Sequence, residues 1–447
     1  MRSPETVAES AWNTWICRLL PWILGLVAWC VYVQGNYVPG GDVTPTELLP
    51  ISVLTEGDLD LDEFYDKDSR LPFWVVVRKD RVISYYPIVA PLLNLPRVWW
   101  ARLQGQDLYL ERERLAHDTA CVITALSVVC MVYVFYGLGL STRTCAFFGA
   151  LYAFGTCVWS IGSQALWQHG PSLLFLAGAM ALLLRNNRWL PLAGLLLGLA
   201  VFNRPTNAVF AVPLTLYVFI HHRPRVLWFL MWAAIPALLM GLYSHVYWGS
   251  ILSLGQGHSF SGTHGDHKTG FGYPLFKGLA SVLISPSRGV FTYTPVLLFA
   301  LPVWALSFWR SKEQPILRYI AYGAAFNLIL LAKWQVWWGG WSWGYRMLVE
   351  MVPALMVFLA MGWQRLSSSQ RRGAQFAKVV MIALIPFGVY IQYLGAFYFN
   401  NDWNRKSNGI DSPQGQERLW DWRDSQWMHY HRMRSEREQR IETLKTE

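Results

Sequence analysis

The chain has 447 residues, of which 53% are hydrophobic and only 15% are charged. Soluble proteins usually carry about 25% charged residues, so this composition argues against a soluble enzyme and indicates a polytopic membrane protein. The formal net charge is +10. The basic residues of the chain lie in short clusters between apolar runs. This pattern is typical of cytoplasmic loops and argues against nucleic-acid binding.

The apolar runs predict the fold class. A helix needs about 20 apolar residues to cross the hydrocarbon core. The candidate spans are 16–34, 115–139, 143–163, 166–184, 189–204, 206–221, 225–248, 289–309, 316–334, 347–364 and 376–399. We therefore expect an all-α polytopic membrane protein with about 11 transmembrane helices and a long first outer loop that contains short helices. The first run is not followed by a small-residue cleavage site, so it predicts a retained anchor. All six cysteines lie in or beside these runs without metal-type spacing, and we expect buried thiols.

The positions of Lys and Arg predict the orientation. Alternate connections hold Arg143; Arg185 and Arg188; Arg223 and Arg225; Arg310 and Lys312; and Arg365, Arg371 and Arg372. These connections are expected in the cytoplasm, which leaves the N-terminus inside and the C-terminus outside. Residues 1–399 then form a transmembrane module with outer loops at about 35–114 and 249–288. Residues 400–447 form an outer-face tail, which we expect to fold over the mouth of the module as an amphipathic helical cover. The alternative is a disordered tail, which the many charges after Arg432 favour for the last dozen or so residues.

The first outer loop begins with the sequence GGDVTPTELLP. Gly40 and Gly41 allow the backbone to turn so that Asp42 points into the mouth of the module. There Asp42 could be a general base that takes a proton from an acceptor hydroxyl. Alternatively, Asp42 could cap the helix that follows it.

Two other outer segments suggest metal binding only weakly. Asp58 and Asp60 form a D-x-D pattern that could hold Mg²⁺ or Mn²⁺, although a solvated strand or turn fits better. His258, His264 and His267 share no helical or strand spacing, so residues 257–274 predict a mobile substrate loop. We therefore expect no metal and no cofactor.

Four cations, Arg204, Arg288, Lys333 and Arg346, are expected at one membrane level on the outer face. His169 and Arg204 lie at outer helix ends, where ionisable groups are costly and often functional. Arg288, Lys333 and Arg346 lie at the ends of neighbouring spans. A ring of cations suits a phosphate group. General anchoring to lipid phosphates is the alternative.

The stretch WWGGWSWGYR, residues 337–346, combines indoles, glycines and one arginine. Indoles prefer the membrane interface, and the flat face of Trp341 could stack on a sugar ring. Arg346 lies four residues before Glu350, so we expect the two to share one helix face and to pair, which would fix the guanidinium toward the site. This stretch therefore predicts one wall of a site for a sugar and a phosphate.

These motifs together resemble the GT-C superfamily of polytopic glycosyltransferases, nearest the protein mannosyltransferase-like bacterial branch. The resemblance rests on GGDVTP, YYPIVAPLLNLP, ALWQHGP, FNRPTN, SPSRGVFTYTP, WWGGWSWGYRMLVEMVP and ERLWDWRD, in that order along nearly the whole chain. Protein mannosyltransferases commonly have adjacent acidic residues in the first loop, whereas Val43 follows Asp42 here, which argues against a protein acceptor.

The resemblance implies a transferase in the bacterial inner membrane that uses a polyprenyl-phosphate sugar donor at the extracytoplasmic face. It also implies that Asp42 is the catalytic base. The acceptor would be a glycan, a lipid or a protein. Two other functions remain open: a transporter or flippase for an anionic lipid or solute, and a metal-independent ligase or polymerase of lipid-linked glycans.

Overall fold

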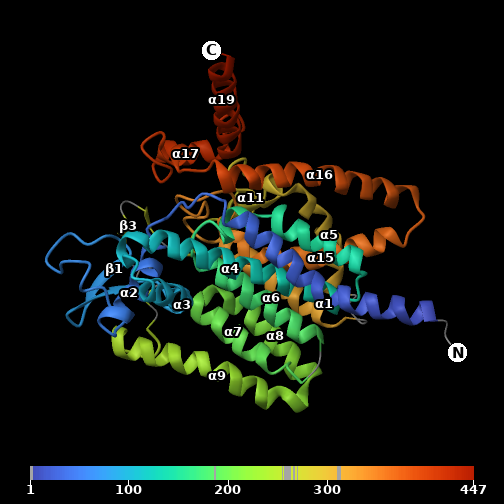
Figure 1. Ribbon diagram of the computed structural model, residues 1–447, viewed down its shortest axis with the longest axis horizontal. Coiled ribbons are helices and arrows are strands. Elements are labelled where there is room, and N and C mark those ends of the chain that lie inside the picture. Colours follow the sequence, from blue (N-terminus) through green and yellow to red (C-terminus); the bar gives the residue numbers. More distant parts are fainter. Residues whose placement is uncertain are drawn as a thin grey trace.

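The computed structural model describes residues 4–185, 188–253, 255, 263–264, 267–268, 270–309 and 314–446. Within these ranges the regular secondary structure is helical apart from two short antiparallel hairpins. Figure 1 shows a bundle of long helices that run roughly side by side, with a compact lobe at one end and the N-terminus at the other.

The bundle confirms the predicted all-α polytopic membrane fold. Its helices are α1 (Pro4–Tyr32), α4 (Leu108–Gly137), α5 (Thr142–Phe154), α6 (His169–Arg185), α7 (Leu192–Asn203), α8 (Ala208–His221), α9 (Val226–Tyr243), α13 (Leu301–Ser307), α14 (Ile316–Ala332), α15 (Val352–Ser367) and α16 (Arg372–Phe397). Four helical stretches are long and apolar enough to cross a membrane, namely Leu108–Gly137, Arg223–Trp248, Arg346–Ser367 and Arg372–Phe397, and shorter apolar helices accompany them.

Two predicted spans are interrupted rather than continuous. In 143–163, helix α5 ends at Phe154, and a π-helical turn, η1 (Val158–Gly162), follows. In 289–309 the chain forms α12 (Val290–Tyr293), the 3₁₀ helix η5 (Pro295–Ala300) and then α13. Pro295 interrupts this second run because proline removes a backbone donor and its ring displaces the preceding turn.

The segment 249–288 is less loop-like than expected, because it contains the apolar helix α11 (Leu275–Ile284). The small hairpin β3 (Thr263–His264) and β4 (His267–Lys268) precedes it. The side chains of the three histidines of this segment lie outside the described residues.

The compact lobe is the first predicted outer loop. It contains α2 (Thr44–Thr55), a hairpin of β1 (Val75–Arg78) and β2 (Arg81–Ser84), and α3 (Val89–Leu103). The sequence predicted the short helices but not the hairpin. Its turn residues Lys79 and Asp80 have φ of 50° and 59°, as a two-residue type I′ turn requires. Helix α2 packs against α3 and α4, which joins the lobe to the bundle.

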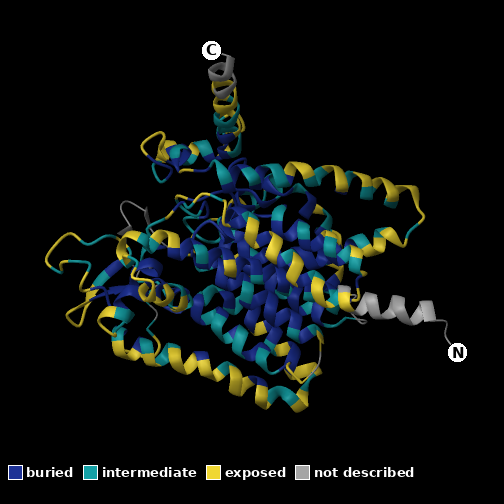
Figure 2. Cartoon of the chain, in the orientation of Figure 1, coloured by how far each residue is buried: buried dark blue, intermediate teal, exposed yellow. Residues whose placement is uncertain are grey.

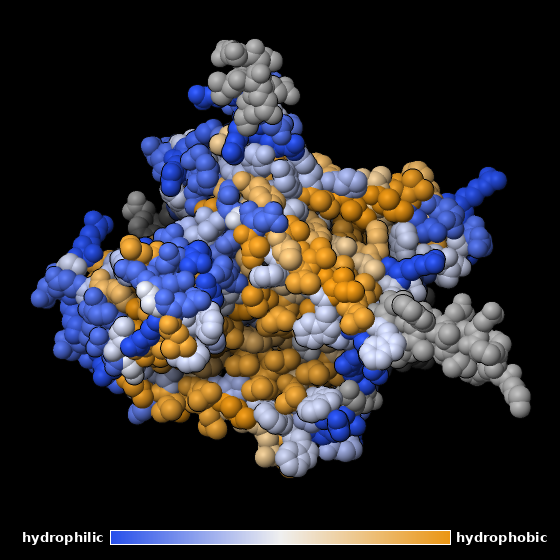
Figure 3. All heavy atoms as spheres, viewed as in Figure 1, coloured by the Kyte–Doolittle hydropathy of each residue, from blue (hydrophilic) through white to orange (hydrophobic). Residues whose placement is uncertain are grey.

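The buried core runs through the centre of the bundle (Figure 2), whereas α9 lies at its margin and is exposed on most of its surface. Figure 3 shows apolar side chains across the middle of the molecule and hydrophilic ones over the lobe and at the turns of the opposite end. On α9, for example, Leu238 is 72% exposed. Apolar surface of this extent marks contact with lipid.

The tail contains α17 (Asp402–Arg405), α18 (Pro413–Glu417), the 3₁₀ helix η7 (Arg418–Trp420) and α19 (Gln426–Thr446). Trp403, Ile410, Leu419 and Tyr430 are buried, so the first 30 or so residues dock as expected. The rest of the tail does not cover the mouth, because α19 projects away from the bundle (Figure 1). Beyond Tyr430 its sequence is dominated by charged residues, which favour water over a packed face.

Candidate active site

A cavity of about 770 Å³ opens at the lobe end of the bundle. Its walls come from segments far apart in the sequence. They include the GGD turn before α2, the Tyr85–Tyr86 pair after β2, the start of α6, the NRPTN turn, the WWGGW stretch (residues 337–341) and the tail. Its polar lining residues include Asp42, Gln168, His169, Arg204, Arg346, Asn401, Arg405 and Asp411. The cavity is large enough for a sugar and a phosphate together.

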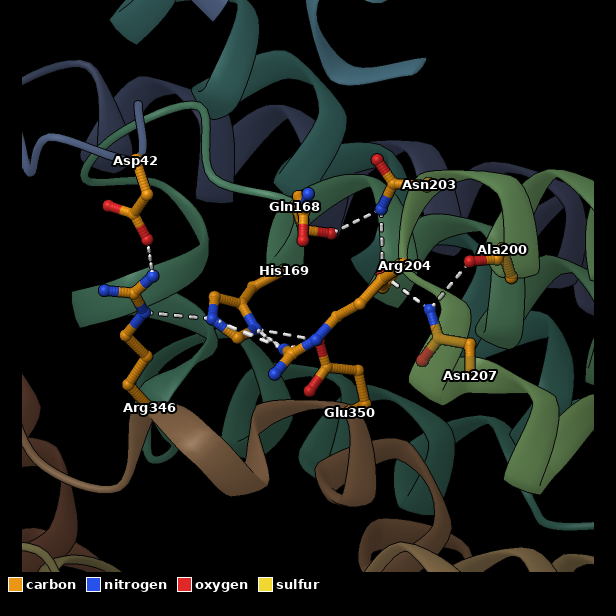
Figure 4. Close-up of polar contacts among 10 residues, drawn as sticks. Asp42, Gln168, His169, Ala200, Asn203, Arg204, Asn207, Arg346 and Glu350 are labelled. Carbon is orange, nitrogen blue, oxygen red and sulfur yellow. Dashed lines mark hydrogen bonds and ion pairs between the residues drawn. The ribbon is translucent and has the colours of Figure 1, made fainter. Parts of the chain in front are cut away.

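Asp42 lines the cavity and forms an ion pair with Arg346 (Figure 4). The two glycines before it are required by close packing. A Cβ on Gly40 would lie 2.8 Å from Asp42 Oδ1, and a Cβ on Gly41 would lie 2.5 Å from the Trp74 ring. Helix α2 has Val43 at its N-cap and no side-chain capping bond. The alternative role of Asp42 as a helix cap is therefore wrong.

Arg346 is held by three groups. It pairs with Asp42, its Nε donates to His169 Nε2 at 3.1 Å, and its guanidinium carbon lies 3.6 Å from the centre of the Trp167 ring. Stacking on an indole fixes the plane of the guanidinium. Arg346 is thereby oriented toward the cavity without contact to Glu350.

Behind Arg346 lies a second, more deeply buried pair. Glu350 Oε1 lies 2.6 Å from Arg204 NH1 and 2.7 Å from His169 Nδ1. Since Nε2 of His169 accepts from Arg346, Nδ1 of the neutral ring carries the hydrogen and donates to Glu350. The histidine thus connects the two ion pairs, as Figure 4 shows.

The predicted pair between Arg346 and Glu350 is wrong. Residues Arg346–Met351 form a 3₁₀ helix, η6, rather than an α-helix. With three residues per turn, positions four apart no longer share a face. Arg346 therefore turns toward Asp42, and Glu350 turns inward toward Arg204.

The backbone around Arg204 is held by the two asparagines of the NRPTN turn. Asn203 Nδ2 donates to the Gln168 carbonyl at 2.6 Å and to Ser172 Oγ at 3.0 Å. Asn207 Nδ2 donates to Ser172 Oγ at 2.8 Å and to the Ala200 carbonyl at 2.9 Å. These amides join the start of α6 to the break between α7 and α8 (Figure 4), and so position His169 and Arg204 together.

Trp341 lines the cavity from the WWGGW stretch. Its Nε1 donates to Asp411 Oδ2 at 2.9 Å, and Trp338 Nε1 donates to Asp411 Oδ1 at the same distance. Gly339 and Gly340 have φ of 72° and 65°, a left-handed conformation that favours glycine. The stretch can therefore fold back on itself and present its indoles to the tail.

Two of the predicted cations do not line the cavity. Arg288 is 2% exposed, and its guanidinium donates to the carbonyls of Trp338 (2.8 Å) and Ser287 (3.0 Å) and to Asn404 Oδ1 (3.0 Å). Lys333 ends α14 outside the residues that line the cavity. The expected ring of four cations is thus reduced to Arg204 and Arg346, joined by Arg405 from the tail.

The acidic pair Asp58 and Asp60 also lies away from the cavity lining. Asp58 Oδ1 accepts from Ser52 Oγ at 2.9 Å, and Asp60 Oδ2 lies 3.3 Å from Arg81 NH1. Burial raises the pKa of Asp60 above its ordinary value. Within the described part of the chain, no group of three or more His, Cys, Asp or Glu side chains could hold a metal ion.

Sequence reasoning missed several lining residues of the site, among them Trp167, Tyr86, Arg405 and Asp411. Trp167 and Tyr86 lie inside the motifs ALWQHGP and YYPIVAPLLNLP, so those motifs carried a usable signal. Burial, and then the nearby Asp42 carboxylate, raise the pKa of the Tyr86 hydroxyl, which therefore stays protonated. Arg405 and Asp411 stand in a tail segment without any recognisable pattern.

No family model and no curated protein matches the sequence. Among solved structures, the chain is similar to ArnT from Cupriavidus metallidurans bound to undecaprenyl phosphate, with a TM-score of 0.50 and 13% identity over 86% of this chain and 71% of that chain. It is similar to apo ArnT from the same organism, with a TM-score of 0.50 and 14% identity over 87% and 71%. ArnT is a glycosyltransferase of the GT-C superfamily. The chain therefore shares its membrane fold with ArnT.

Proposed function

We propose that the protein is a membrane glycosyltransferase that moves a sugar from a polyprenyl-phosphate donor to an acceptor hydroxyl at the extracytoplasmic face. The observation that carries the proposal is the shared cavity of Asp42, Arg346 and Arg204, which combines a carboxylate with two guanidinium groups. The GT-C fold and the undecaprenyl phosphate bound to one ArnT structure support a lipid-linked donor. The basic connections of the sequence support the orientation.

The proposed reaction is a displacement at the anomeric carbon of the donor. The acceptor oxygen forms a bond to that carbon, while the bond from the carbon to the phosphate oxygen breaks. The polyprenyl phosphate leaves with the electron pair, and the acceptor proton moves to the Asp42 carboxylate. Arg346 and Arg204 stabilise the charge that develops on the phosphate.

The pairing of Asp42 with Arg346 sets the order in which the donor and the acceptor bind. A guanidinium presents donors on two edges, and Arg346 uses part of them on Asp42 and His169. The anionic phosphodiester of the donor, placed beside Arg346, competes with Asp42 for those donors, because charge-assisted bonds to phosphate are strong. Donor binding then frees a carboxylate lone pair for the acceptor hydroxyl, so the donor binds first.

The test begins with the lipid-linked sugar that co-purifies with the protein, identified by mass spectrometry. Release of undecaprenyl phosphate from that lipid is then measured in proteoliposomes supplied with a membrane extract as the source of acceptor. Asp42→Asn retains the size of the side chain but does not accept the proton, so turnover should fall by about 10²–10⁴. Binding of undecaprenyl phosphate should persist, because the arginines remain.

Asp58→Asn is the matched control, since Asp58 belongs to the same lobe but does not line the cavity, and its turnover should stay at the wild-type level. Normal turnover in Asp42→Asn would refute the role of Asp42 as the base. Movement of the intact lipid-linked sugar across the bilayer without release of undecaprenyl phosphate would instead establish a flippase.

A further inference from the structure

The first part of the tail belongs to the cavity wall. Asn401, Arg405 and Asp411 line the same cavity as Asp42 and Arg346. All three residues belong to the tail, and this part of the wall adjoins Trp341 of the WWGGW stretch. The proposed chemistry at Asp42 and Arg346 leaves this wall without a role.

This wall is held rigidly by buried polar groups. Gln426 Nε2 donates to the Ser342 carbonyl at 2.9 Å, and its Oε1 accepts from the Gly344 backbone amide at 2.9 Å. The Arg288 guanidinium donates hydrogen bonds to both the Trp338 carbonyl and Asn404 Oδ1. Because these groups are buried, opening the contact would leave several polar atoms without partners, at a high cost. The tail and the WWGGW stretch therefore form one surface.

Asp411 sets the orientation of the two indoles on that surface. Its two carboxylate oxygens each accept one indole N–H, from Trp338 and from Trp341. Trp341 is 38% exposed. With its only polar atom already bonded to Asp411, the indole offers the cavity an apolar face. Gly409 lies against the same ring, where a Cβ would approach Trp341 Cζ2 to 3.4 Å.

The chemistry of the wall selects among ligands. A free phosphate is disfavoured by the Asp411 carboxylate, and a hydrocarbon chain is disfavoured by the polar groups beside the ring. The Arg405 side chain is 66% exposed, and its 3.8 Å contact with Asp402 is loose. A flat apolar ring face next to the exposed donors of Arg405 and the half-buried Asp411 carboxylate matches a saccharide, which has C–H groups on its ring faces and hydroxyls at its edge.

We infer that Trp341, Arg405 and Asp411 form a saccharide subsite in which a sugar ring stacks on the Trp341 indole and its hydroxyls contact Arg405 and Asp411. The inference deepens the proposed function and rests on it. It makes the tail a determinant of sugar specificity rather than a structural appendage. The sugar comes from the donor or from the acceptor.

The test uses the full chain in phospholipid nanodiscs, with a panel of methyl glycosides as probes. Binding is followed by saturation-transfer NMR, and undecaprenyl phosphate binding is followed separately by native mass spectrometry. Trp341→Ala and Arg405→Ala should weaken the binding of the preferred glycoside by about tenfold, while undecaprenyl phosphate still binds. Trp341→Phe keeps an aromatic face and should restore most of the affinity.

Trp422→Ala is the matched control, since Trp422 is a tail indole that is 58% exposed and lies outside the cavity lining. It should bind the glycoside as the wild type does. Displacement of the glycoside by undecaprenyl-phosphate glucose would assign the subsite to the donor sugar. Simultaneous binding of the two would assign it to the acceptor.

The inference is overturned if no glycoside binds to the wild-type protein, or if Trp341→Ala binds the glycoside normally. Either result leaves the proposed function intact as long as undecaprenyl phosphate binds and Asp42 is required. Failure of undecaprenyl phosphate to bind the wild type would instead count against the proposed function, and the glycoside result would then be judged separately.

Discussion

The charged residues of the site form two linked pairs, and each pair joins remote parts of the chain. Arg346 and Asp42 are 304 positions apart, and Arg204 and Glu350 are 146 positions apart. A guanidinium at this depth is costly without a carboxylate partner, so each arginine is compensated within the protein. The carboxylates therefore keep two cations in place beside the cavity, where a phosphate could replace one partner.

Glu350 provides the first prediction. Its side chain is 2% exposed, and it neutralises Arg204, whose side chain is 11% exposed. Glu350→Gln would leave that guanidinium without a charged partner, so we expect a loss of about 3 kcal/mol in stability. The measurement is the apparent Tm in detergent, followed by intrinsic fluorescence.

Glu438→Gln is the matched control for Glu350→Gln. It removes the partner of Arg434 on α19, but the Glu438 carboxylate is 54% exposed, so the Tm should stay unchanged. An unchanged Tm for Glu350→Gln would mean that water in the cavity already screens Arg204.

At the scale of elements, α2 is held in place by a buried acid. Glu47 is 3% exposed, accepts a hydrogen bond from the Tyr37 hydroxyl and lies 3.5 Å from Arg112 Nε at the start of α4. Tyr37 and Glu47 stand five residues before and after Asp42, so this contact also fixes the segment that carries Asp42. Burial raises the pKa of Glu47 from 4.5 to about 7.

This pKa predicts a pH dependence of the local stability of α2. The folded segment binds the Glu47 proton up to about pH 7, whereas the unfolded segment releases it near pH 4.5. Between these values the folded state holds more protons, so the stability of α2 should fall as the pH rises, by an amount on the order of 3 kcal/mol. Amide hydrogen exchange of residues 44–55, converted to opening free energies, measures this change.

Glu47→Gln should remove the dependence, because the amide does not titrate. Glu56, which is exposed just after α2, provides the matched control. Glu56→Gln should keep the wild-type dependence of α2 stability on pH. A slope that survives in Glu47→Gln would assign the pH response to another group of the lobe.

At the scale of the whole molecule, polar structure is concentrated at one end. The lobe, the cavity and the WWGGW stretch lie at the end opposite the N-terminus and the turn between α15 and α16 (Figure 1). That turn holds Arg371 and Arg372, and the turn between α8 and α9 holds Arg223 and Arg225. The excess of basic residues away from the cavity predicts that the cavity faces the extracytoplasmic side.

Cysteine labelling tests this orientation. Gln414 and Arg371 are both exposed, on the tail and on a basic turn respectively. A membrane-impermeant maleimide should label Gln414→Cys in intact cells above the background of the native thiols, and it should label Arg371→Cys only after permeabilisation. The reverse pattern would place the cavity in the cytoplasm and exclude a donor at the outer face.

The sequence alone was sufficient for the class of fold and for much of the cavity. The lengths of the apolar runs predicted the helices, because a chain in lipid must satisfy its backbone hydrogen bonds within each helix. Asp42, His169, Arg204, Arg346 and Trp341 were predicted because a polar group or an interfacial ring beside an apolar run is visible locally.

Only the tertiary structure decided the partners of these residues. Arg346 pairs with Asp42 rather than Glu350, because η6 is a 3₁₀ helix and its geometry depends on packing. Arg288 fastens the tail instead of lining the cavity, and Asp411 meets Trp341 from 70 positions away. The local sequence shows which segments avoid water, but it does not show which distant carboxylate neutralises a given cation. That choice depends on how the helices pack.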